Sequence, residues 1–356
     1  MRVRGYELTY PRLLLAALVV VVISSGFVGL TTSETAFGSY NPAWDGASEV
    51  RTLAGNTGAQ TEIVRETSAY TGQSGSGTTA LVVSPTESYS DRDSERIAAF
   101  VQGGGTLVVA SDFDDQTNPL LADLGVTARF DGRLIRDERR YYRSPPLAVA
   151  PNVNDTELTA DVSRLTLNHG TAINTGANST IIVNTSGYAY FDTNRNGALD
   201  DAEELAERPV VVRESVGEGT VVAVSDPSIF INSMLDVSDN RAFARNLVSD
   251  ETVLFDYSHR SGIPPVVAVV LTIADSPLLQ FLSITVLVGI SAALWRSNRI
   301  PLPWTESSSP EIGDVGPSET ELLDRVTARH PEWDESRVER VARGIMPDAP
   351  KEDEDD

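Results

Sequence analysis

The chain contains no cysteine and almost no lysine. The absence of cysteine from all 356 residues excludes disulfides, thiol catalysis and cysteine-ligated metals. Only Lys351 is a lysine among 28 basic residues, which face 51 acidic residues and leave a formal net charge of −23. Because acidic residues so outnumber basic ones, we do not expect a basic surface large enough to bind nucleic acid. An acidic surface with so little lysine is typical of halophilic proteins, because salt screens the repulsion between carboxylates while their hydration is retained.

Two long stretches of the chain lack charge. Residues 13–30 (LLLAALVVVVISSGFVGL) and 278–295 (LLQFLSITVLVGISAALW) are each long enough to span a bilayer. Arginines precede the first stretch and follow the second, so the positive-inside rule places both ends of the chain in the cytoplasm. A cleaved signal peptide is the alternative for the first stretch, and a buried core helix is the alternative for the second.

This topology divides the chain into five parts at the cell membrane. We expect a cytoplasmic N-terminus over 1–12, transmembrane helices over 13–30 and 277–296, an extracellular domain over 31–276, and an acidic cytoplasmic tail over 297–356. Two helical patterns after residue 318 are each too short to be stable alone. They indicate either a docking site for a cytoplasmic partner or a loosely helical solubilising tail.

The extracellular segment has the pattern of an α/β fold. Apolar runs predict strands at 61–64, 80–83 and 107–110. Between the last two, Ile97, Ala98 and Val101 share one helical face, and three glycines end that helix. The order strand, helix, strand favours a parallel sheet. Later runs predict a β-rich insertion over about 125–215, a hairpin from 209–214 and 220–224, and a closing helix and strand. The predicted fold is a single three-layer α/β domain.

Several stretches resemble a known group of proteins. NPAWDGAS, the unit LVVSPTE…IAAFVQGGGTLVVASD, and GEGTVVAVSDPSIFIN followed by VLFDYSH are similar to an uncharacterised membrane-anchored family. The outer domain of that family resembles the class I glutamine amidotransferase fold. Its members are associated with MoxR-type ATPases and von Willebrand-like proteins, so the resemblance implies a membrane complex. Because amidotransferases need a nucleophilic cysteine, glutamine hydrolysis by that mechanism is excluded here.

Polar residues follow several of the expected strands. The carboxyl ends of strands in an open α/β sheet face the ligand crevice, so these residues are candidates for a ligand site. They are Ser84, Ser111, Asp112, Asp226, Asn232 and His259. The alternative is that they form turns and helix caps. A serine–histidine–aspartate set of Ser225, Asp226 and His259 would suit a hydrolase, but the sequence does not fix its geometry, and no catalytic residue is assigned.

The stretch FDTNRNGALDDAEE has the spacing of a twelve-residue calcium loop. Counted from Asp192, oxygen ligands fall at positions 1, 3, 5, 7, 9 and 12, and Gly197 at position 6 supplies the sharp turn. The predicted ligands are Asp192, Asn194, Asn196, the Ala198 carbonyl, Asp200 and Glu203. Two asparagines reduce the charge, so we expect a structural Ca²⁺ held with a Kd of roughly 10⁻⁴–10⁻³ M. The alternative is a metal-free turn that caps a helix over DAEELAE.

An arginine-rich run, GRLIRDERRYYRSP, stands out in so acidic a domain. Its guanidinium groups suit either an anionic glycan or lipid headgroup, or ion-pair networks with surrounding carboxylates. Taken together, these features predict a non-catalytic, membrane-anchored binding or scaffolding component of a cell-envelope complex. The alternatives are an envelope hydrolase that uses serine or aspartate at the strand ends, and a calcium-dependent surface adhesion module.

Overall fold

A computed structural model of the chain describes residues 2–3, 6–7, 10, 14–15, 17–22, 32–113, 116–260, 262–274, 276–296, 319–331 and 333–345. The chain divides into two compact units, 1–280 and 281–356. In the first unit, two short strands near the N-terminus, β1 (Arg2–Val3) and β2 (Tyr6–Glu7), pair antiparallel. Most of the expected first span, residues 13, 16 and 23–30, lies outside the described residues.

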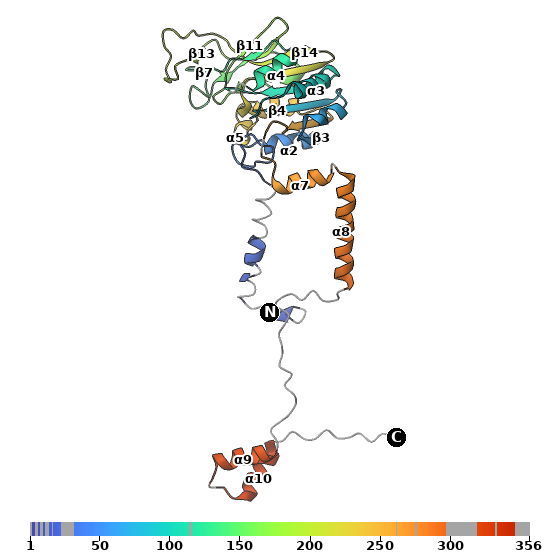
Figure 1. Cartoon of the computed structure of the whole chain (residues 1–356). Helices are drawn as coiled ribbons and strands as arrows, with labels where there is room; N and C mark the ends of the chain where they lie inside the picture. The colour runs from blue at the N-terminus through green and yellow to red at the C-terminus, as the bar shows by residue number, and fades with distance from the viewer. Residues whose placement is uncertain are drawn as a thin grey trace. The chain divides into compact units, whose positions relative to one another are not determined.

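An eight-stranded sheet forms the centre of the first unit (Figure 1). Five strands run parallel, and three antiparallel strands extend the sheet at one edge. In spatial order they are β3 (Gln60–Val64), β16 (Thr252–Asp256), β4 (Thr78–Val83), β5 (Thr106–Ala110), β15 (Gly219–Val224), β14 (Pro209–Val216), β12 (Thr180–Asn184) and β9 (Asn152–Val153). The predicted parallel βαβ unit and the predicted hairpin are confirmed as β4–α3–β5 and β14–β15.

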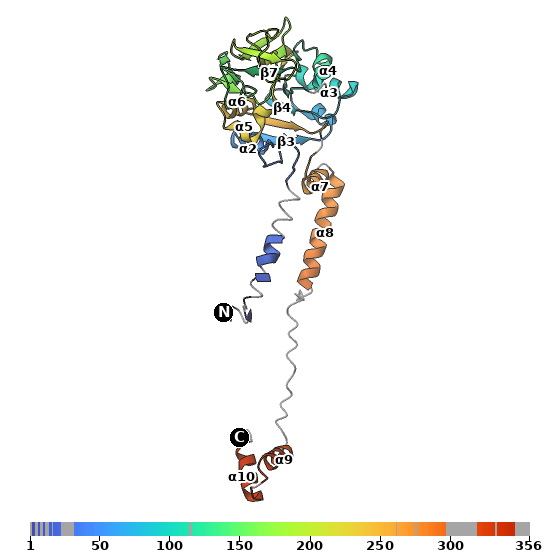
Figure 2. The ribbon, with the colours of Figure 1, turned by 90° about the vertical axis from the view of Figure 1, so that its left-hand side faces the viewer.

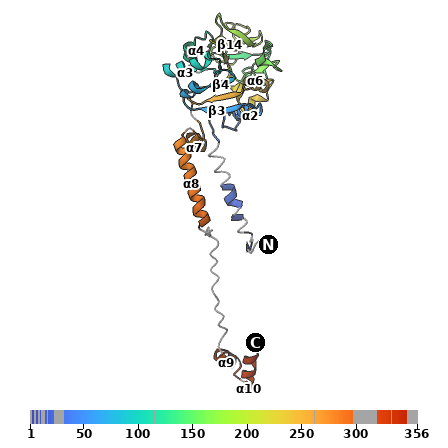
Figure 3. The ribbon, with the colours of Figure 1, turned by 90° about the vertical axis from the view of Figure 1, so that its right-hand side faces the viewer.

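Helices cover both faces of this sheet (Figures 2 and 3). On one face, α2 (Ser48–Asn56) and α6 (Asn240–Leu247) pack over Leu81, Val108 and Val253. On the other face, α3 (Asp91–Gln102) and α4 (Thr117–Asp123) pack over Val82, Val109 and Leu254. Successive residues of a strand point to opposite faces, so each central strand contributes to both cores. The result is the predicted three-layer arrangement of a mixed α/β domain.

The crossover helix α3 begins and ends where its sequence dictates. The Ser90 hydroxyl accepts from the Asp93 N–H and the Asp93 carboxylate accepts from the Ser90 N–H, which forms a capping box. At the other end the chain turns tightly back into β5. A Cβ on Gly105 would lie 2.4 Å from the Phe100 ring, and one on Gly219 would lie 2.0 Å from the Val101 carbonyl oxygen. Glycine at both positions therefore lets α3 pack closely on the sheet.

The segment from 125 to 215 is rich in short strands, as predicted, but part of it belongs to the central sheet. Strands β9, β12 and β14 continue the sheet beyond β15. The other strands form three two-stranded sheets: β6 (Arg129–Phe130) with β11 (Ile173–Asn174), β7 (Leu134–Asp137) with β13 (Ala189–Asp192), and β8 (Val149–Ala150) with β10 (Leu165–Thr166). Strands β7, β11 and β13 lie at the opposite end of the domain from α2 (Figure 1).

Short helical turns complete the domain. They are η1 (Thr67–Gly72), η2 (Glu157–Thr159), η3 (Pro227–Phe230) and α5 (Asn232–Leu235). The helix that the sequence suggested over DAEELAE is absent, because residues 201–203 form turns and 204–208 have no regular structure. Glu203 instead turns back and accepts hydrogen bonds from the backbone of the preceding loop.

Two apolar helices follow the domain: α7 (Pro265–Ala274) and α8 (Pro277–Arg296). The second coincides with the stretch predicted to span a membrane. Within the described ranges, no helix taken singly has the length and hydropathy of a membrane span. Helix α7 together with residues 277–293 of α8 meets both criteria, with a bend of 110° between them.

The second unit contains two further helices, α9 (Glu319–Arg329) and α10 (Glu335–Ile345). They confirm the two short helices predicted for the tail. The turn between them is closed by His330, whose ring stacks on Trp333 at 4.1 Å between centroids. Val338 of α10 is buried, with 5% of its surface exposed. Each helix therefore gains from the other some of the burial that it lacks alone.

Candidate functional site

The carboxyl ends of the parallel strands meet at one edge of the sheet. The Ser84 N–H donates to the Ala110 carbonyl at 2.9 Å, and the Ser111 N–H donates to the Val224 carbonyl at 3.1 Å. Ser84, Ser111 and the pair Ser225–Asp226 therefore follow neighbouring strands β4, β5 and β15. Ser84 has a φ of +45°, a left-handed backbone conformation that is rare for a serine. The structure thus brings together four of the predicted crevice residues, Ser84, Ser111, Asp112 and Asp226.

Asp226 is the most perturbed acid at this edge. Its side chain is completely buried, and its two oxygens accept hydrogen bonds from the Asn168 and Ser228 N–H groups. Gly170 lies so close that a Cβ there would be 2.9 Å from the Asp226 Cβ. Burial raises the pKa of Asp226 to about 7 against these hydrogen bonds, and the charge of Asp112 adds to the shift. A carboxyl that titrates near neutrality therefore lies directly beneath the strand ends.

His259 follows β16, the parallel neighbour of β4, and its carbonyl accepts from the Thr86 N–H at 3.0 Å. Its Nδ1 lies 2.8 Å from the Ser258 Oγ, and that hydroxyl donates to the Asp256 carboxylate at 2.6 Å. Its Nε2 lies 3.5 Å from Asp93 Oδ2, and its ring stacks on Tyr89 at 3.8 Å between centroids. The network continues through the Tyr70 hydroxyl, which donates to Asp256. It connects the end of β16 to the first turn of α3.

The set of Ser225, Asp226 and His259 is not assembled as a catalytic triad. The Ser225 hydroxyl is buried and has no hydrogen-bond partner among the described residues, and the His259 ring contacts Ser258 and Asp93 instead. Hydrogen bonds from Ser90 and Thr67 lower the pKa of Asp93 to about 2. Sequence reasoning missed this network, although the Ser258–His259 dipeptide, separated by one residue from the end of β16, was visible in the sequence.

Asn232 connects distant segments of the chain. Its side-chain amide donates to the Ala43 carbonyl at 2.7 Å, and its Oδ1 accepts from the Glu49 N–H at 3.0 Å. Only 9% of its surface is exposed. Asn232 thus ties α5 to the segment that leads into α2.

A hollow of about 390 Å³ lies beside the strand ends. Its polar groups include the side chains of Arg136, Arg195 and His169, and Phe113, two residues after Ser111, contributes an apolar wall. The Arg195 guanidinium lies 5.6 Å from the centre of the Phe113 ring. Arg195, His169 and the Phe113 ring suit an anionic ligand with an apolar part, whereas the Arg136 guanidinium is held by the Gly197 carbonyl and Asp192 adds a carboxylate to the lining. The sequence predicted arginines in this region but did not indicate which of them share a cavity.

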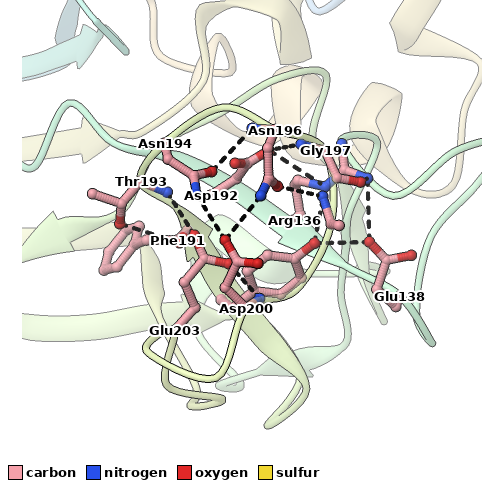
Figure 4. Close-up of polar contacts among 12 residues, drawn as sticks. Arg136, Glu138, Phe191, Asp192, Thr193, Asn194, Asn196, Gly197, Asp200 and Glu203 are labelled. Carbon is pink, nitrogen blue, oxygen red and sulfur yellow. Dashed lines mark hydrogen bonds and ion pairs between the residues drawn. The ribbon is translucent and has the colours of Figure 1, made fainter.

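The predicted calcium loop contributes Asp192, Arg195, Asn196 and Gly197 to the lining of this hollow. Figure 4 shows the polar contacts of the loop. Its backbone turns as the spacing predicts, with Gly197 at a φ of +78°. Three of the side chains at predicted ligand positions accept backbone hydrogen bonds from within the loop: Asp192 from Gly197 at 3.1 Å, Asn194 from Asn196 at 3.0 Å, and Asn196 from Ala198 at 2.8 Å. These bonds direct the side chains at positions 1, 3 and 5 toward the interior of the loop.

The second half of the loop closes on the first. Both asparagine amides donate to Asp200 Oδ2, at 2.7 Å from Asn194 and 2.9 Å from Asn196. Glu203 accepts from the Thr193 N–H at 2.9 Å. In the part of the chain that the structure describes, no three His, Asp or Glu side chains are placed together to hold a metal. The carboxylates of Asp192, Asp200 and Glu203 are therefore not grouped around one point in this structure, and the other predicted donors of the loop are two asparagine oxygens and one backbone carbonyl.

Comparison with known proteins places the domain in a family and gives only distant structural likeness. A family described as "Domain of unknown function (DUF4350)" matches residues 39–248. No curated protein matches the chain. Among solved structures, the chain is similar to the N-terminal domain of mmIFT52, with 15% identity, a TM-score of 0.38, and coverage of 49% of this chain and 75% of that one.

Two proteins of Salmonella typhimurium show similar likeness. The cytoplasmic protein STM1381 of strain LT2 has 14% identity and a TM-score of 0.38, with coverage of 57% of this chain and 86% of that one. The cytoplasmic protein STM3548 has 10% identity and a TM-score of 0.37, with coverage of 57% and 84%.

Proposed function

The chain belongs to the DUF4350 family, and from this premise we propose that it is a membrane-anchored binding component of a cell-envelope complex. In this proposal, residues 31–276 lie outside the cell and residues 297–356 lie in the cytoplasm. The outer domain has a class I glutamine amidotransferase-like fold without amidotransferase chemistry, which the five parallel strands, the helices on both faces and the absence of cysteine support. The acidic, lysine-poor surface supports a high-salt medium.

The observation that carries the anchoring is the exposure of α8. Seven of its apolar side chains between Leu278 and Ile290 expose 47 to 67% of their surfaces. No charged residue occurs between 277 and 295. A helix that is apolar all round belongs in a core or a bilayer, and a helix of 20 residues is about 30 Å long, the thickness of the hydrocarbon layer. A bilayer would cover this apolar surface.

Binding, in place of catalysis, is supported by the arrangement at the strand ends. Asp226, Ser258 and His259 are engaged in hydrogen bonds that hold segments of the domain together. The neighbouring hollow offers cationic and aromatic groups that suit recognition of an anionic ligand. The domain therefore offers a ligand-binding surface whose residues are positioned by the central sheet.

The topology can be tested by labelling, because the native chain has no cysteine. Single cysteines at two exposed serines, Ser74→Cys and Ser336→Cys, report on the two sides of the membrane. A membrane-impermeant maleimide is expected to label Ser74→Cys in intact cells, and to label Ser336→Cys only after lysis. The unsubstituted chain is the matched control for background labelling. Equal labelling of both variants in intact cells would overturn the proposed topology.

The partner class that the resemblance implies is a MoxR-type ATPase. Because ATP is available in the cytoplasm, such a partner would contact the cytoplasmic tail, which contains α9 and α10. After cross-linking in cells, the full chain is expected to co-purify with this ATPase. Val338→Asp, which puts a charge between the two helices, is expected to abolish the recovery, whereas Glu339→Ala on the exposed side retains it. Recovery that is absent from the unsubstituted chain, or unchanged in Val338→Asp, would contradict this partnership.

A further inference from the structure

We propose that the loop from Asp192 to Glu203 is a Ca²⁺ site that fixes one wall of the hollow beside the strand ends. The ligands are Asp192 Oδ1, the side-chain oxygens of Asn194, Asn196 and Asp200, the Ala198 carbonyl, and the Glu203 carboxylate. The proposal does not depend on the membrane topology or on the ATPase partner. It rests on the contacts of the loop in Figure 4.

The strongest evidence is a buried carboxylate oxygen that nothing satisfies. Only 2% of the Asp192 side chain is exposed, and its Oδ1 has no hydrogen-bond partner among the residues that the structure describes. A buried oxygen that carries charge is costly unless a hydrogen bond or a cation compensates it. Asp192 occupies the first ligand position of the loop, so the unsatisfied oxygen lies where the motif places a ligand to the ion.

The other Asp192 oxygen is already held, which fixes the direction of the free one. Asp192 Oδ2 accepts from the Gly197 N–H and lies 3.7 Å from Arg136 Nε. The same guanidinium donates to the Gly197 carbonyl at 2.7 Å, and the Tyr190 hydroxyl is 3.0 Å from its Nε. Arg136 therefore supports the loop from outside and leaves Oδ1 available to an ion. We regard Arg136 as a positioning residue of the site.

The asparagine side chains are compatible with an ion. Each side-chain carbonyl accepts one backbone N–H, and a carbonyl oxygen has a second lone pair for a cation. Their amide groups donate to Asp200 Oδ2, so hydrogen-bond donors from inside the loop already satisfy that carboxylate oxygen. A bound cation would replace these two weak donors with a full charge. Asp200 then becomes a ligand without a change in the loop's backbone.

The chemistry of the donors selects the ion. All the ligands are oxygens, and none is a sulfur or an imidazole nitrogen, which disfavours zinc and copper. Six positions that supply a mixture of carboxylate, amide and backbone oxygens suit Ca²⁺, which accepts flexible geometry, better than Mg²⁺, which demands near-octahedral geometry. With three carboxylates and two amides, the expected Kd is roughly 10⁻⁴–10⁻³ M.

A bound ion would act on the neighbouring hollow. Arg195, Asn196 and Gly197 belong both to the loop and to the lining of the hollow. When the side chains at positions 1, 3 and 5 bind one ion, the backbone between them is fixed. The Cα atom of Arg195, from which its side chain extends into the hollow, is fixed with it. The ion is therefore a structural element that shapes a ligand site, and it has no catalytic role.

The test is calorimetric titration of the full chain, purified in detergent and high-salt buffer, with CaCl₂. One binding event with a Kd in the stated range is expected. Asp200→Asn and Glu203→Gln are each expected to weaken it at least tenfold. Asp201→Asn is the matched control, because it removes the same charge from the adjacent, exposed residue, which is not a ligand, and it should change Kd less than twofold. Asp192→Asn, with retained thermal unfolding as the folding check, is expected to abolish binding.

Either of two results of the calcium titration would overturn the proposal. One is the absence of calcium-dependent heat in a chain that unfolds cooperatively. The other is an equal weakening by Asp200→Asn, Asp201→Asn and Glu203→Gln, which would mean that calcium only screens the acidic surface. Titration with MgCl₂ under the same conditions is expected to give binding at least tenfold weaker, and equal affinity for both ions would also contradict a calcium site.

Discussion

Glu214→Ala is expected to lower the free energy of unfolding by about 4 kcal/mol. Glu214 lies in β14, with only 3% of its surface exposed. Its carboxylate accepts from the Thr127 N–H at 2.8 Å, the Ala128 N–H at 2.8 Å, the Thr127 hydroxyl at 2.7 Å and the Ser179 hydroxyl at 2.6 Å. Removal of the carboxylate leaves two backbone N–H groups and two hydroxyls without this acceptor, and each unsatisfied buried donor costs about 1–3 kcal/mol.

The free energy of unfolding is measured by denaturing the full chain chemically. The circular dichroism of its aromatic residues reports the fraction unfolded. Glu218→Ala, which removes an exposed carboxylate at the turn of the same hairpin, is the matched control and should change the free energy by less than about 0.5 kcal/mol. Glu214→Gln keeps one acceptor oxygen and is expected to fall between the two. A Glu214→Ala chain as stable as Glu218→Ala would refute the role of this carboxylate.

We also expect the protein to lose stability in acid, because protonation of Glu214 removes the charge that its hydrogen-bond donors stabilise. Burial raises the pKa of Glu214, but the hydrogen bonds from Ser179, Thr127 and Ala128 outweigh burial and hold it below the ordinary value of 4.5. A depressed pKa in the folded chain means that the stabilisation is present above the unfolded value and is lost as the pH falls through the folded value. The contribution of Glu214 is therefore lost progressively as the pH falls below 4.5 and through the lower pKa of the folded chain.

We expect the ionisation of Asp226 to lower the stability of the folded chain as the pH rises toward neutrality, whereas the ionisation of Glu214 raises it. Its pKa is about 7 in the folded chain and 3.8 when unperturbed, with burial as the main cause. A raised pKa in the folded chain means that the contribution to stability is fully present below 3.8 and is lost as the pH rises through 7. One pKa unit corresponds to about 1.4 kcal/mol, so the loss across this window is up to about 4 kcal/mol.

Asp226→Asn, which is neutral at every pH, tests this expectation. The free energy of unfolding of the unsubstituted chain should fall relative to that of the variant as the pH rises from 4 to 7. Asp155→Asn, at an exposed position, should keep the pH dependence of the unsubstituted chain. Unfolding curves at half-unit pH steps provide the measurement. If Asp226→Asn and the unsubstituted chain remain parallel across this range, then Asp226 is ionised throughout and the assignment is wrong.

The two acids show what a sequence can and cannot reveal about a buried carboxyl. Glu214 stands in an apolar strand pattern and Asp226 directly after another, and nothing in either pattern distinguishes their environments. The partners of Glu214 are 35 to 87 residues away in the chain. Asp226 is buried because Asn168 and Gly170 cross over it from the insertion. Both pKa shifts, in opposite directions, come from these remote contacts.

The crevice residues illustrate the same limit. The prediction that polar residues meet at the strand ends needed only the parallel order of β4, β5 and β15, and the structure brings Ser84, Ser111 and Asp226 to that edge. The same reasoning places Asn232 and His259 in the crevice. His259 follows β16, the parallel neighbour of β4, and its carbonyl accepts from the Thr86 N–H at 3.0 Å, while its ring contacts Ser258 and Asp93. The Asn232 side chain holds the segment that leads into α2. Their partners depend on how α2 and α3 pack, which no local pattern specifies.

By itself, the sequence determined the local structure of this protein: the core strands, the capping box and glycine stop of α3, the apolar helix α8 and the turn of the Asp192 loop. Each follows from interactions between residues a few positions apart, which are encoded as periodicity, caps and turn residues. Only the tertiary structure decided that β16 lies between β3 and β4, that Tyr70 meets Asp256 from 186 residues away, and that the loop adjoins a hollow with Phe113 and His169. The physical reason is that remote pairing depends on sheet register and on the closure of long loops, and many remote pairings are compatible with the same local pattern.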